Sequence, residues 1–272
     1  MKVCFLGGGN MAGALIGGLI RGGVPADRLC AVDIDPAQRA RLHEQYAIVA
    51  FETPQQALPG CDCVVLAVKP QQVQALARSI APQLSGQLIV TICAGIGTGD
   101  LGRWLGGHRR IVRAMPNTPA LIGQGVSGLY AQAALAVEDR RAAERILGAV
   151  GSVIWVEREA LIDAVTAVSG SGPAYVFLLI EAFEAAAIEA GLDAAQARAL
   201  VTGTFVGAAA LAAQSSESPA TLRARVTSRG GTTERGIAAL EAGSVRTLAA
   251  QAVAAAHLRA IELGSEFGKD QE

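Results

Sequence analysis

Short apolar runs alternate with helix-like segments through the first 156 residues of the chain. The runs cover residues 2–6 (KVCFL), 28–32, 47–51, 63–68, 88–92 and 110–115. Most of them lack polar alternation, which is typical of strands covered on both faces, and the segments between them suit right-handed crossover helices. The pattern predicts an α/β fold with a doubly wound, Rossmann-like and mostly parallel sheet. Runs at 126–131 and 152–156 extend this sheet, with a helix over 137–150 between them.

Beyond residue 160 the strand signals nearly vanish and helical patterns take over. Helices are predicted at 173–190, 193–214, 218–225, 233–242 and 244–264. Prolines stand in the first turn of two of these segments, and glycines end others. We therefore predict a dinucleotide-binding domain over 1–158 and an all-α domain over 159–272. The Ala- and Gly-rich stretch 203–213 permits close helix packing, which suits either subunit association, the reading we favour, or a tight monomer core.

Charge content narrows the class of binding partner, and cysteine content indicates the cellular compartment. The 272 residues carry 23 basic and 24 acidic side chains, a net charge of −1 with no run of one sign. This balance argues against nucleic acid and an anionic membrane surface, and favours a small molecule. Five scattered cysteines do not resemble a disulfide framework, so we expect a cytoplasmic protein.

Two local patterns have a simple interpretation and a more elaborate one. Cys61 and Cys63 form a CxC that strand alternation would place on one face of a strand, and we interpret them as buried strand residues. With three dispersed histidines and no second cysteine pair, no metal site is predicted. The first 20 residues superficially resemble a secretory signal, but their glycines argue for a loop, and we expect a soluble protein.

A glycine-rich loop follows the first predicted strand and opens a helix. The sequence Gly7-Gly8-Gly9-Asn10-Met11-Ala12 satisfies G-x-G-x-x-A in the strand–turn–helix context that gives this motif its meaning. Gly7 permits the tight turn and Gly9 lets the backbone approach a pyrophosphate. The diphosphate would lie on the helix N-terminus, where free N–H groups favour negative charge. A dinucleotide is therefore predicted.

Other candidate cofactor residues stand at strand ends. Asp33 ends the second strand, where a carboxylate accepts hydrogen bonds from a ribose diol and favours NAD. Arg39 and Arg41 follow closely and suit a 2′-phosphate, so the sequence leaves NADH and NADPH open. Lys69-Pro70 ends the fourth strand in a chain that otherwise uses arginine almost everywhere. Residues 93–95 and 115–119 fall on the same edge and suit a flat ring pocket.

A second glycine-rich helix start lies in the stretch 226–241, VTSRGGTTERGIAALE. Gly230 and Gly231 can turn successive backbone N–H groups inward, and the helix starting near Thr233 adds the positive end of its dipole. Such a turn can hold a small carboxylate without a buried cationic side chain. On this stretch alone, an ordinary capped helix start is the simpler interpretation.

Together these motifs resemble the pyrroline-5-carboxylate reductase family over nearly the whole chain. The segments that carry the resemblance, in order, are FLGGGNMA, AVKPQ, CAGI, MPNTPA, IDAVTAVSGSGPAY and VTSRGGTTERGIAALE. The resemblance implies NADPH- or NADH-dependent reduction of the C=N bond of 1-pyrroline-5-carboxylate to L-proline, the last step of proline biosynthesis. It also implies a homodimer formed through the helical domains, which assembles further into rings in many members, with the substrate loop at the dimer interface.

The family's site residues carry over onto matching positions. The implied cofactor contacts are Leu6, Gly7, Gly8, Gly9, Asn10, Met11, Ala67, Val68, Lys69, Pro70, Cys93, Ala94, Gly95 and Asn117. The implied substrate residues are Ser228, Thr232, Thr233 and Glu159, beside the Gly230-Gly231 turn. Because threonine is a poor general acid, we expect Thr233 to orient and polarise the imine nitrogen, with the proton arriving from water.

Three departures from the family pattern and two rival functions remain. Arg229 replaces the usual proline, Thr53-Pro54 stands where many members have an asparagine, and Asp33 is unexpected in a family in which many members prefer NADPH. A β-hydroxyacid dehydrogenase would need a lysine in the helical half, where the tail residue Lys269 is the only candidate. A noncatalytic NAD(P)H-sensing subunit would lack turnover.

Overall fold

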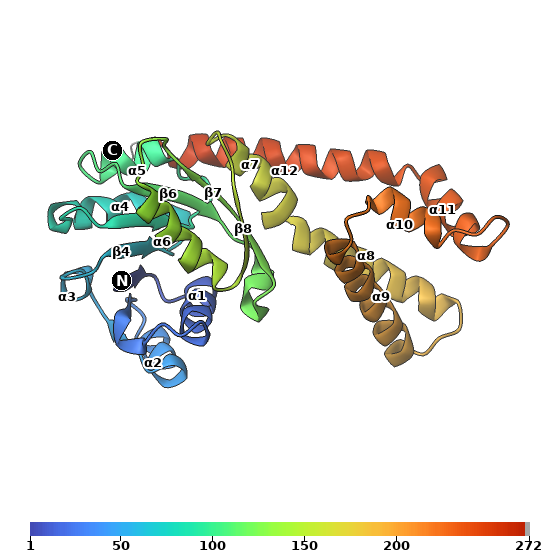
Figure 1. The fold of residues 1–272 in the computed structure, drawn as a ribbon, viewed down its shortest axis with the longest axis horizontal. Helices are drawn as coiled ribbons and strands as arrows, with labels where there is room; N and C mark the ends of the chain where they lie inside the picture. Colours follow the sequence, from blue (N-terminus) through green and yellow to red (C-terminus); the bar gives the residue numbers. More distant parts are fainter. Residues whose placement is uncertain (270–272) are drawn as a thin grey trace. The chain divides into compact units, whose positions relative to one another are not determined.

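The structure is a computed structural model that describes residues 1–269, and its first half is built on one sheet of eight strands (Figure 1). The strands are β1 (Val3–Leu6), β2 (Leu29–Val32), β3 (Val49–Phe51), β4 (Cys63–Leu66), β5 (Leu88–Thr91), β6 (Ile111–Met115), β7 (Gly125–Ala131) and β8 (Gly151–Trp155). Each of them overlaps an apolar run that predicted a strand. The doubly wound α/β fold class is therefore confirmed.

The strand order creates the crevice in which a ligand can sit. The order is β3-β2-β1-β4-β5-β6-β7-β8, with parallel pairing throughout except between β6 and β7. The chain winds outward from β1 in one direction through β2 and β3, and in the other from β4 onward. This reversal leaves a crevice beyond the carboxyl ends of β1 and β4, the place where open α/β sheets bind ligands.

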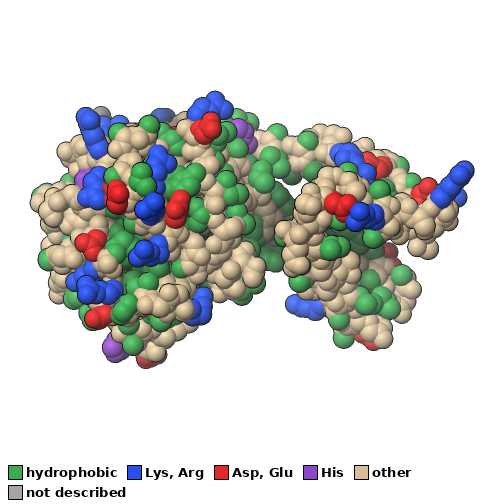
Figure 2. All heavy atoms as spheres, in the orientation of Figure 1, with side chains coloured by type: hydrophobic (Ala, Val, Ile, Leu, Met, Phe, Trp, Pro, Cys, Tyr) green, Lys and Arg blue, Asp and Glu red, His purple; other side chains and the backbone are tan. Residues whose placement is uncertain are grey.

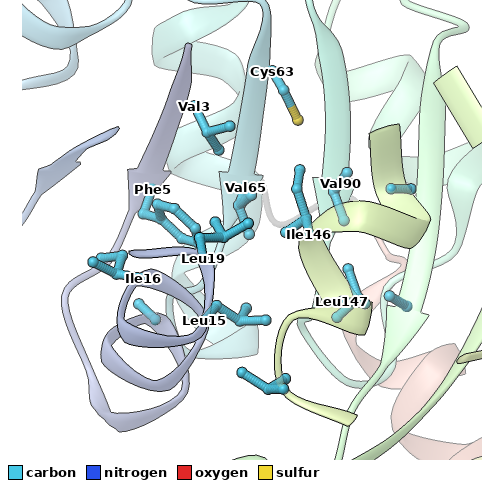
Figure 3. Close-up of a cluster of buried hydrophobic side chains, with 14 of the residues drawn as sticks. Val3, Phe5, Leu15, Ile16, Leu19, Cys63, Val65, Val90, Ile146 and Leu147 are labelled. Atoms are coloured by element: carbon cyan, nitrogen blue, oxygen red, sulfur yellow. The ribbon is translucent and has the colours of Figure 1, made fainter. Parts of the chain in front are cut away.

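Two hydrophobic cores cover the two faces of the sheet. One core joins the sheet to α1 (Asn10–Arg21), α2 (Pro36–Tyr46) and α6 (Val137–Gly148), and the other joins it to α3 (Pro54–Ala57), α4 (Pro70–Ile80) and α5 (Thr98–Trp104). Figure 3 shows the first core, where Phe5 and Val65 of the strands meet Leu15 of α1 and Ile146 of α6. Burial on both faces explains why the strand sequences lack polar alternation.

The expectation that Cys61 and Cys63 share a strand face is wrong. Cys63 is the first residue of β4 and packs in the core beneath α1, whereas Cys61 packs in the core beneath α3 and α4. Strand alternation starts only at Cys63, because Cys61 lies in the loop that follows α3. Both side chains are buried, as predicted.

The helices predicted for the second half are found close to their predicted bounds: α8 (Gly172–Glu189), α9 (Ala194–Gln214), α10 (Pro219–Arg225), α11 (Thr232–Ala242) and α12 (Val245–Phe267). A short helix, α7 (Leu161–Val165), precedes them in a stretch for which no element was predicted. A π-helical turn at Thr166–Gly170 connects α7 to α8, in a stretch for which the sequence analysis predicted no element. Within the described chain, contacts divide the molecule into two units, residues 1–171 with 255–269, and residues 172–254.

The helices of residues 172–254 bury few of their apolar side chains within this chain. Phe177, Leu178 and Val206 are each about two-thirds exposed, at 65%, 64% and 65%. Among residues 1–269, one helix could cross a membrane by length and composition alone, Leu161–Glu189 with a mean hydropathy of 1.4. On the visible face in Figure 2, acidic and basic side chains stand next to one another with apolar side chains between them.

Candidate functional site

A cavity of about 580 Å³ lies beyond the carboxyl ends of β1, β2 and β4. That volume falls within the range of pockets for small molecules and cofactors, roughly 300–1,000 Å³. Among the residues that line it are these predicted cofactor residues: Leu6, Gly7, Gly8, Gly9, Asp33, Ala67, Val68 and Lys69. The fold thus brings together residues from three separate predicted strand ends.

The glycine loop has the geometry that its motif requires. Gly7 has a φ of +106°, and a Cβ placed there would lie 2.5 Å from the carbonyl oxygen of Ala67. Gly9 is the N-cap residue of α1, and nothing lies within 4 Å of the position its Cβ would take. The first amides of α1 therefore face a space that side chains leave open, as a diphosphate needs.

Asp33 is fixed at the wall of this cavity by two backbone donors. Its carboxylate accepts hydrogen bonds from the N–H of Gly8 at 2.7 Å and from the N–H of Asp35 at 2.9 Å. The nearby guanidinium groups bind backbone instead. Arg39 donates to the carbonyl of Asp33 at 2.8 Å and Arg41 to that of Gly8 at 2.6 Å. The carboxylate of Asp33 is therefore fixed at the cavity wall, while both guanidinium groups are engaged by backbone carbonyls.

The remaining predicted cofactor residues follow strand ends of the same sheet but do not line the cavity. Asn10 and Met11 begin α1, Pro70 begins α4, and Cys93, Ala94 and Gly95 follow β5. The single S–H of Cys93 has two carbonyl acceptors within reach, those of Leu66 at 3.3 Å and Val68 at 3.2 Å, which ties this loop to the end of β4. Burial raises the pKa of Cys93 to about 11, so the thiol stays neutral.

Asn117 follows β6 at the same edge of the sheet, and its side-chain amide is held from two sides. The amide nitrogen donates to Ser169 Oγ at 3.2 Å, and the amide oxygen accepts from the N–H of Val126 at 2.9 Å. Its orientation is therefore fixed by the π-helical turn and by β7.

Glu159 is the predicted substrate residue that lies in the first unit. Its carboxylate accepts from the N–H of Thr98 at 2.6 Å and from the hydroxyl of Thr98 at 2.8 Å, at the start of α5. Arg113 of β6, only 6% exposed, lies 3.6 Å from the same carboxylate and 2.8 Å from that of Asp163. These contacts hold the start of α5 in place, directly after the loop that contains residues 93–95.

The predicted substrate loop precedes α11 in the second unit. Gly230 has a φ of +72°, and the N–H of Gly231 donates to the carbonyl of Ser228 at 3.0 Å. Gly231 is the N-cap residue of α11 and has no side-chain cap hydrogen bond in the described chain. The N–H of Gly230 donates to the carboxylate of Glu234 at 2.7 Å, so this loop already binds one carboxylate. Thr233 is half-buried, and Ser228 is exposed.

Sequence reasoning missed several residues that line the cavity. Glu52 follows β3, and Gln38 and Gln72 belong to α2 and α4. Glu52 stands at the carboxyl end of a predicted strand, and that position was the signal available for it. The two glutamines lie within predicted helices, where nothing in their sequence spacing sets them apart from other exposed residues.

Comparison with known proteins shows similarity over the full chain. A family model described as pyrroline-5-carboxylate reductase dimerisation matches residues 159–263, and one described as NADP oxidoreductase coenzyme F420-dependent matches residues 2–95. A pyrroline-5-carboxylate reductase of Pseudomonas aeruginosa is 47% identical, with 98% of each chain covered.

Solved structures agree with this similarity. The structure of a pyrroline-5-carboxylate reductase from Coxiella burnetii is 40% identical with a TM-score of 0.92, over 96% of this chain and 98% of that one. A Plasmodium falciparum pyrroline carboxylate reductase, solved with NADP bound, is 29% identical with a TM-score of 0.86, over 97% and 98% of the two chains.

Proposed function

Because this chain belongs to the pyrroline-5-carboxylate reductase family, we propose that two helix N-termini, those of α1 and α11, hold its two anionic reactants. The protein is an NAD(P)H-dependent oxidoreductase that reduces the C=N bond of 1-pyrroline-5-carboxylate to give L-proline, the last step of proline biosynthesis. The observation that carries this function is 47% identity to a curated relative over 98% of both chains.

The cofactor half of the proposal rests on the loop between β1 and α1. The diphosphate of NADH or NADPH lies against the amides at the start of α1, where the close approach of Gly7 to Ala67 leaves no room for a side chain. Asn10 and Met11 supply amides, and Ala67 to Pro70 flank the cofactor along the end of β4. Cys93, Ala94, Gly95 and Asn117 complete the nicotinamide end.

We further propose that the adenosine ribose favours NADH. Asp33, Asp35 and Glu52 all line the cavity, and the carboxylate of Asp33 is held by the amide of Gly8. A ribose diol can donate hydrogen bonds to this carboxylate, whereas a 2′-phosphate would meet negative charge. Arg39 and Arg41 would have to leave their backbone partners to neutralise that phosphate.

The substrate half of the proposal rests on the loop that precedes α11. The substrate carboxylate binds the amides of Thr232 and Thr233, at a helix start without a side-chain cap. Gly230 and Gly231 shape the turn, and Ser228 lies beside it. The bond from the N–H of Gly230 to the carboxylate of Glu234 supports this assignment, because a backbone amide of the same turn already donates to a carboxylate.

Thr233 is the proposed catalytic residue. Hydride chemistry belongs to the cofactor, and the protein supplies position and polarity. The hydroxyl of Thr233 orients and polarises the imine nitrogen, whose proton comes from water because threonine is a poor acid. Holding the imine carbon at the nicotinamide is worth several kcal/mol, roughly 7–11 in good intramolecular cases.

Glu159 stays a proposed substrate-binding residue, and it also holds the loop that follows β5. Its carboxylate is bound by Thr98 and lies beside Arg113, so we propose that it positions residues 93–98. We keep residues 1–158 and 159–272 as the two proposed domains, the second for substrate binding and dimerisation. We place the protein in the cytoplasm, where five free cysteines are expected to stay reduced.

The protein forms a homo-oligomer, and we propose that a homodimer is the basic unit and that rings of dimers can form from it. The dimerisation model covers residues 159–263, the part of the chain with the most exposed apolar helix surface. A second copy covering α8 accounts for its apolar side chains without a membrane.

A direct assay tests the function. Purified protein is expected to oxidise NADH or NADPH only when pyrroline-5-carboxylate is present, and to release one proline for each cofactor oxidised. Absence of proline with both cofactors, despite measurable cofactor binding, would identify a noncatalytic sensing subunit instead.

A further inference from the structure

Three cysteines from separate segments converge in the core beneath α3 and α4. Cys4 lies on β1 and is paired in register with Cys30 of β2, while Cys61 lies in the loop before β4. All three Sγ atoms lie within 4.8 Å of one another. Their exposed fractions are 0%, 3% and 6%, so water has little access to the cluster.

Simple packing explains the other two cysteines better than it explains these three. Cys63 and Cys93 are also buried and free, but neither belongs to a cluster of sulfur atoms. In the cluster, the thiols of Cys61 and Cys30 share one acceptor, the carbonyl of Ala57, at 3.1 and 3.9 Å. Buried thiols can pack as small apolar groups, yet convergence of three from three segments is the arrangement of a ligand set.

The spacing of the sulfur atoms fits a trigonal metal site. A metal–sulfur bond of about 2.3 Å places three trigonal sulfur ligands about 4.0 Å apart. The Sγ atoms, which lie within 4.8 Å of one another, therefore need only small shifts to reach this spacing. Among the described residues, no histidine or carboxylate joins the cluster, so the fourth ligand that structural zinc requires is missing. Soft thiolate ligands without nitrogen or oxygen partners select monovalent copper.

We propose that Cys4, Cys30 and Cys61 form a three-sulfur site for Cu(I). Binding forms metal–sulfur bonds and breaks S–H bonds, and the released protons pass to water. Copper enters and stays in the monovalent state, so no electron is transferred. Cys61 provides the entry point, because its neighbours Gly60 and Asp62 are exposed in the same loop.

The site is separate from the proposed cofactor machinery. Cys4 precedes the glycine loop on β1, and no member of the cluster lines the 580 Å³ cavity. Bound copper would tie β1, β2 and the loop before β4 to one another. Its expected effect is a higher melting temperature of the loaded protein, since a ligand that binds only the folded state stabilises it.

Competition for Cu(I) between the whole protein and a coloured chelator, without oxygen, tests the proposal. The reduced wild-type protein is expected to remove one Cu(I) per chain from the bicinchoninate complex and to melt at a higher temperature with copper. Cys61→Ala is expected to bind Cu(I) at least ten-fold more weakly and to lose the melting shift. Cys63→Ala is the matched control, a buried cysteine outside the cluster, and should bind like the wild type.

Folding controls and a second variant keep the result decisive. Melting without copper and NADH turnover establish that each variant is folded, and Cys30→Ala gives an independent loss of one ligand. The proposal is overturned if the wild type takes no copper, if Cys61→Ala binds unchanged, or if Cys63→Ala is weakened equally. Tighter retention of Zn(II) than of Cu(I) would also overturn the assignment.

Discussion

At the scale of single residues, Asp33 is the side chain that we propose selects between NADH and NADPH. Its carboxylate is held by the amide of Gly8, so its charge cannot turn away from a 2′-phosphate without losing that bond. We predict a higher kcat/KM with NADH than with NADPH for the wild type. Asp33→Ser removes the charge and should shift the NADPH/NADH ratio of kcat/KM upward by about ten-fold, or about 1.4 kcal/mol.

Steady-state kinetics with both cofactors measure this ratio. Asp27→Ser is the charge-matched control, since Asp27 is exposed in the short 3-10 helix before β2 and lies outside the cavity. A wild type that prefers NADPH, with the ratio unmoved in Asp33→Ser, would show that the carboxylate does not select the cofactor.

Thr233 gives a second test at this scale, because its proposed partner is the substrate alone. Thr233→Ala removes one hydroxyl and should lower kcat/KM for pyrroline-5-carboxylate by about ten-fold, the effect of about 1.4 kcal/mol on a barrier. The dissociation constant of NADH, followed by its fluorescence, should stay within about two-fold. An equal loss in cofactor binding would mean that the hydroxyl serves the cofactor.

Residues in local motifs were predictable, and residues that act through distant partners were not. Gly7, Asp33 and Lys69 follow predicted strands, and strand ends of a parallel sheet meet at one edge. Arg113 instead lies inside the run of β6 and pairs with Asp163, 50 positions later in the chain. No spacing rule connects such residues, because the fold alone brings them together.

At the scale of elements, the start of α11 tests whether the substrate loop depends on its glycines. A Cβ on Gly231 would overlap the hydroxyl oxygen of Ser228 and lie 3.1 Å from its carbonyl oxygen, so Gly231→Ala must displace the side chain of Ser228 and crowd the turn. We predict at least a ten-fold loss of kcat/KM, with NADH binding retained. Gly236→Ala, within the same helix and open to solvent, is the control and should stabilise the protein by up to about 1 kcal/mol.

Both glycine variants are compared by turnover and by thermal melting. Full activity in Gly231→Ala would show that the loop tolerates a side chain and does not shape a carboxylate site. A loss of activity in Gly236→Ala equal to that in Gly231→Ala would point to a general sensitivity of α11.

Most helices and strands were predicted from the sequence, and the errors lie at an irregular helical turn and at the start of a strand. Every predicted strand and the five helices predicted for the second half appear, since burial on both faces and terminal Pro or Gly residues leave clear signals. The π-helical turn at Thr166–Gly170 was missed, because the SGSG sequence at 169–172 that overlaps its end resembles a break. Cys61 was misplaced because the strand begins two residues later than alternation assumed.

At the scale of the whole molecule, the exposed apolar side chains of α8 indicate a surface for subunit association. The sequence predicted that small apolar residues in the all-α domain favour subunit association. The structure adds that the larger side chains of Phe177 and Leu178 are more than half exposed. Contiguous exposure of this kind marks an association surface in a protein that forms a homo-oligomer. The number of copies cannot be predicted from one chain, because symmetry is a property of the partner's placement.

Replacing Phe177 by glutamate tests that surface directly. If a second copy covers α8, Phe177→Glu places a charge in an apolar interface, where desolvation without a partner is costly. We predict that the variant dissociates at concentrations where the wild type stays associated, a weakening of at least about 100-fold, or about 2.7 kcal/mol. Val137→Glu is the control, because Val137 is similarly exposed at 56% but lies at the start of α6.

Light scattering after size-exclusion chromatography gives the mass of each protein, and an unchanged mass for Phe177→Glu would place the interface elsewhere. Since the substrate loop is expected at the dimer interface, turnover of Phe177→Glu should fall together with its mass. A fully active monomer would show instead that one chain completes the site alone.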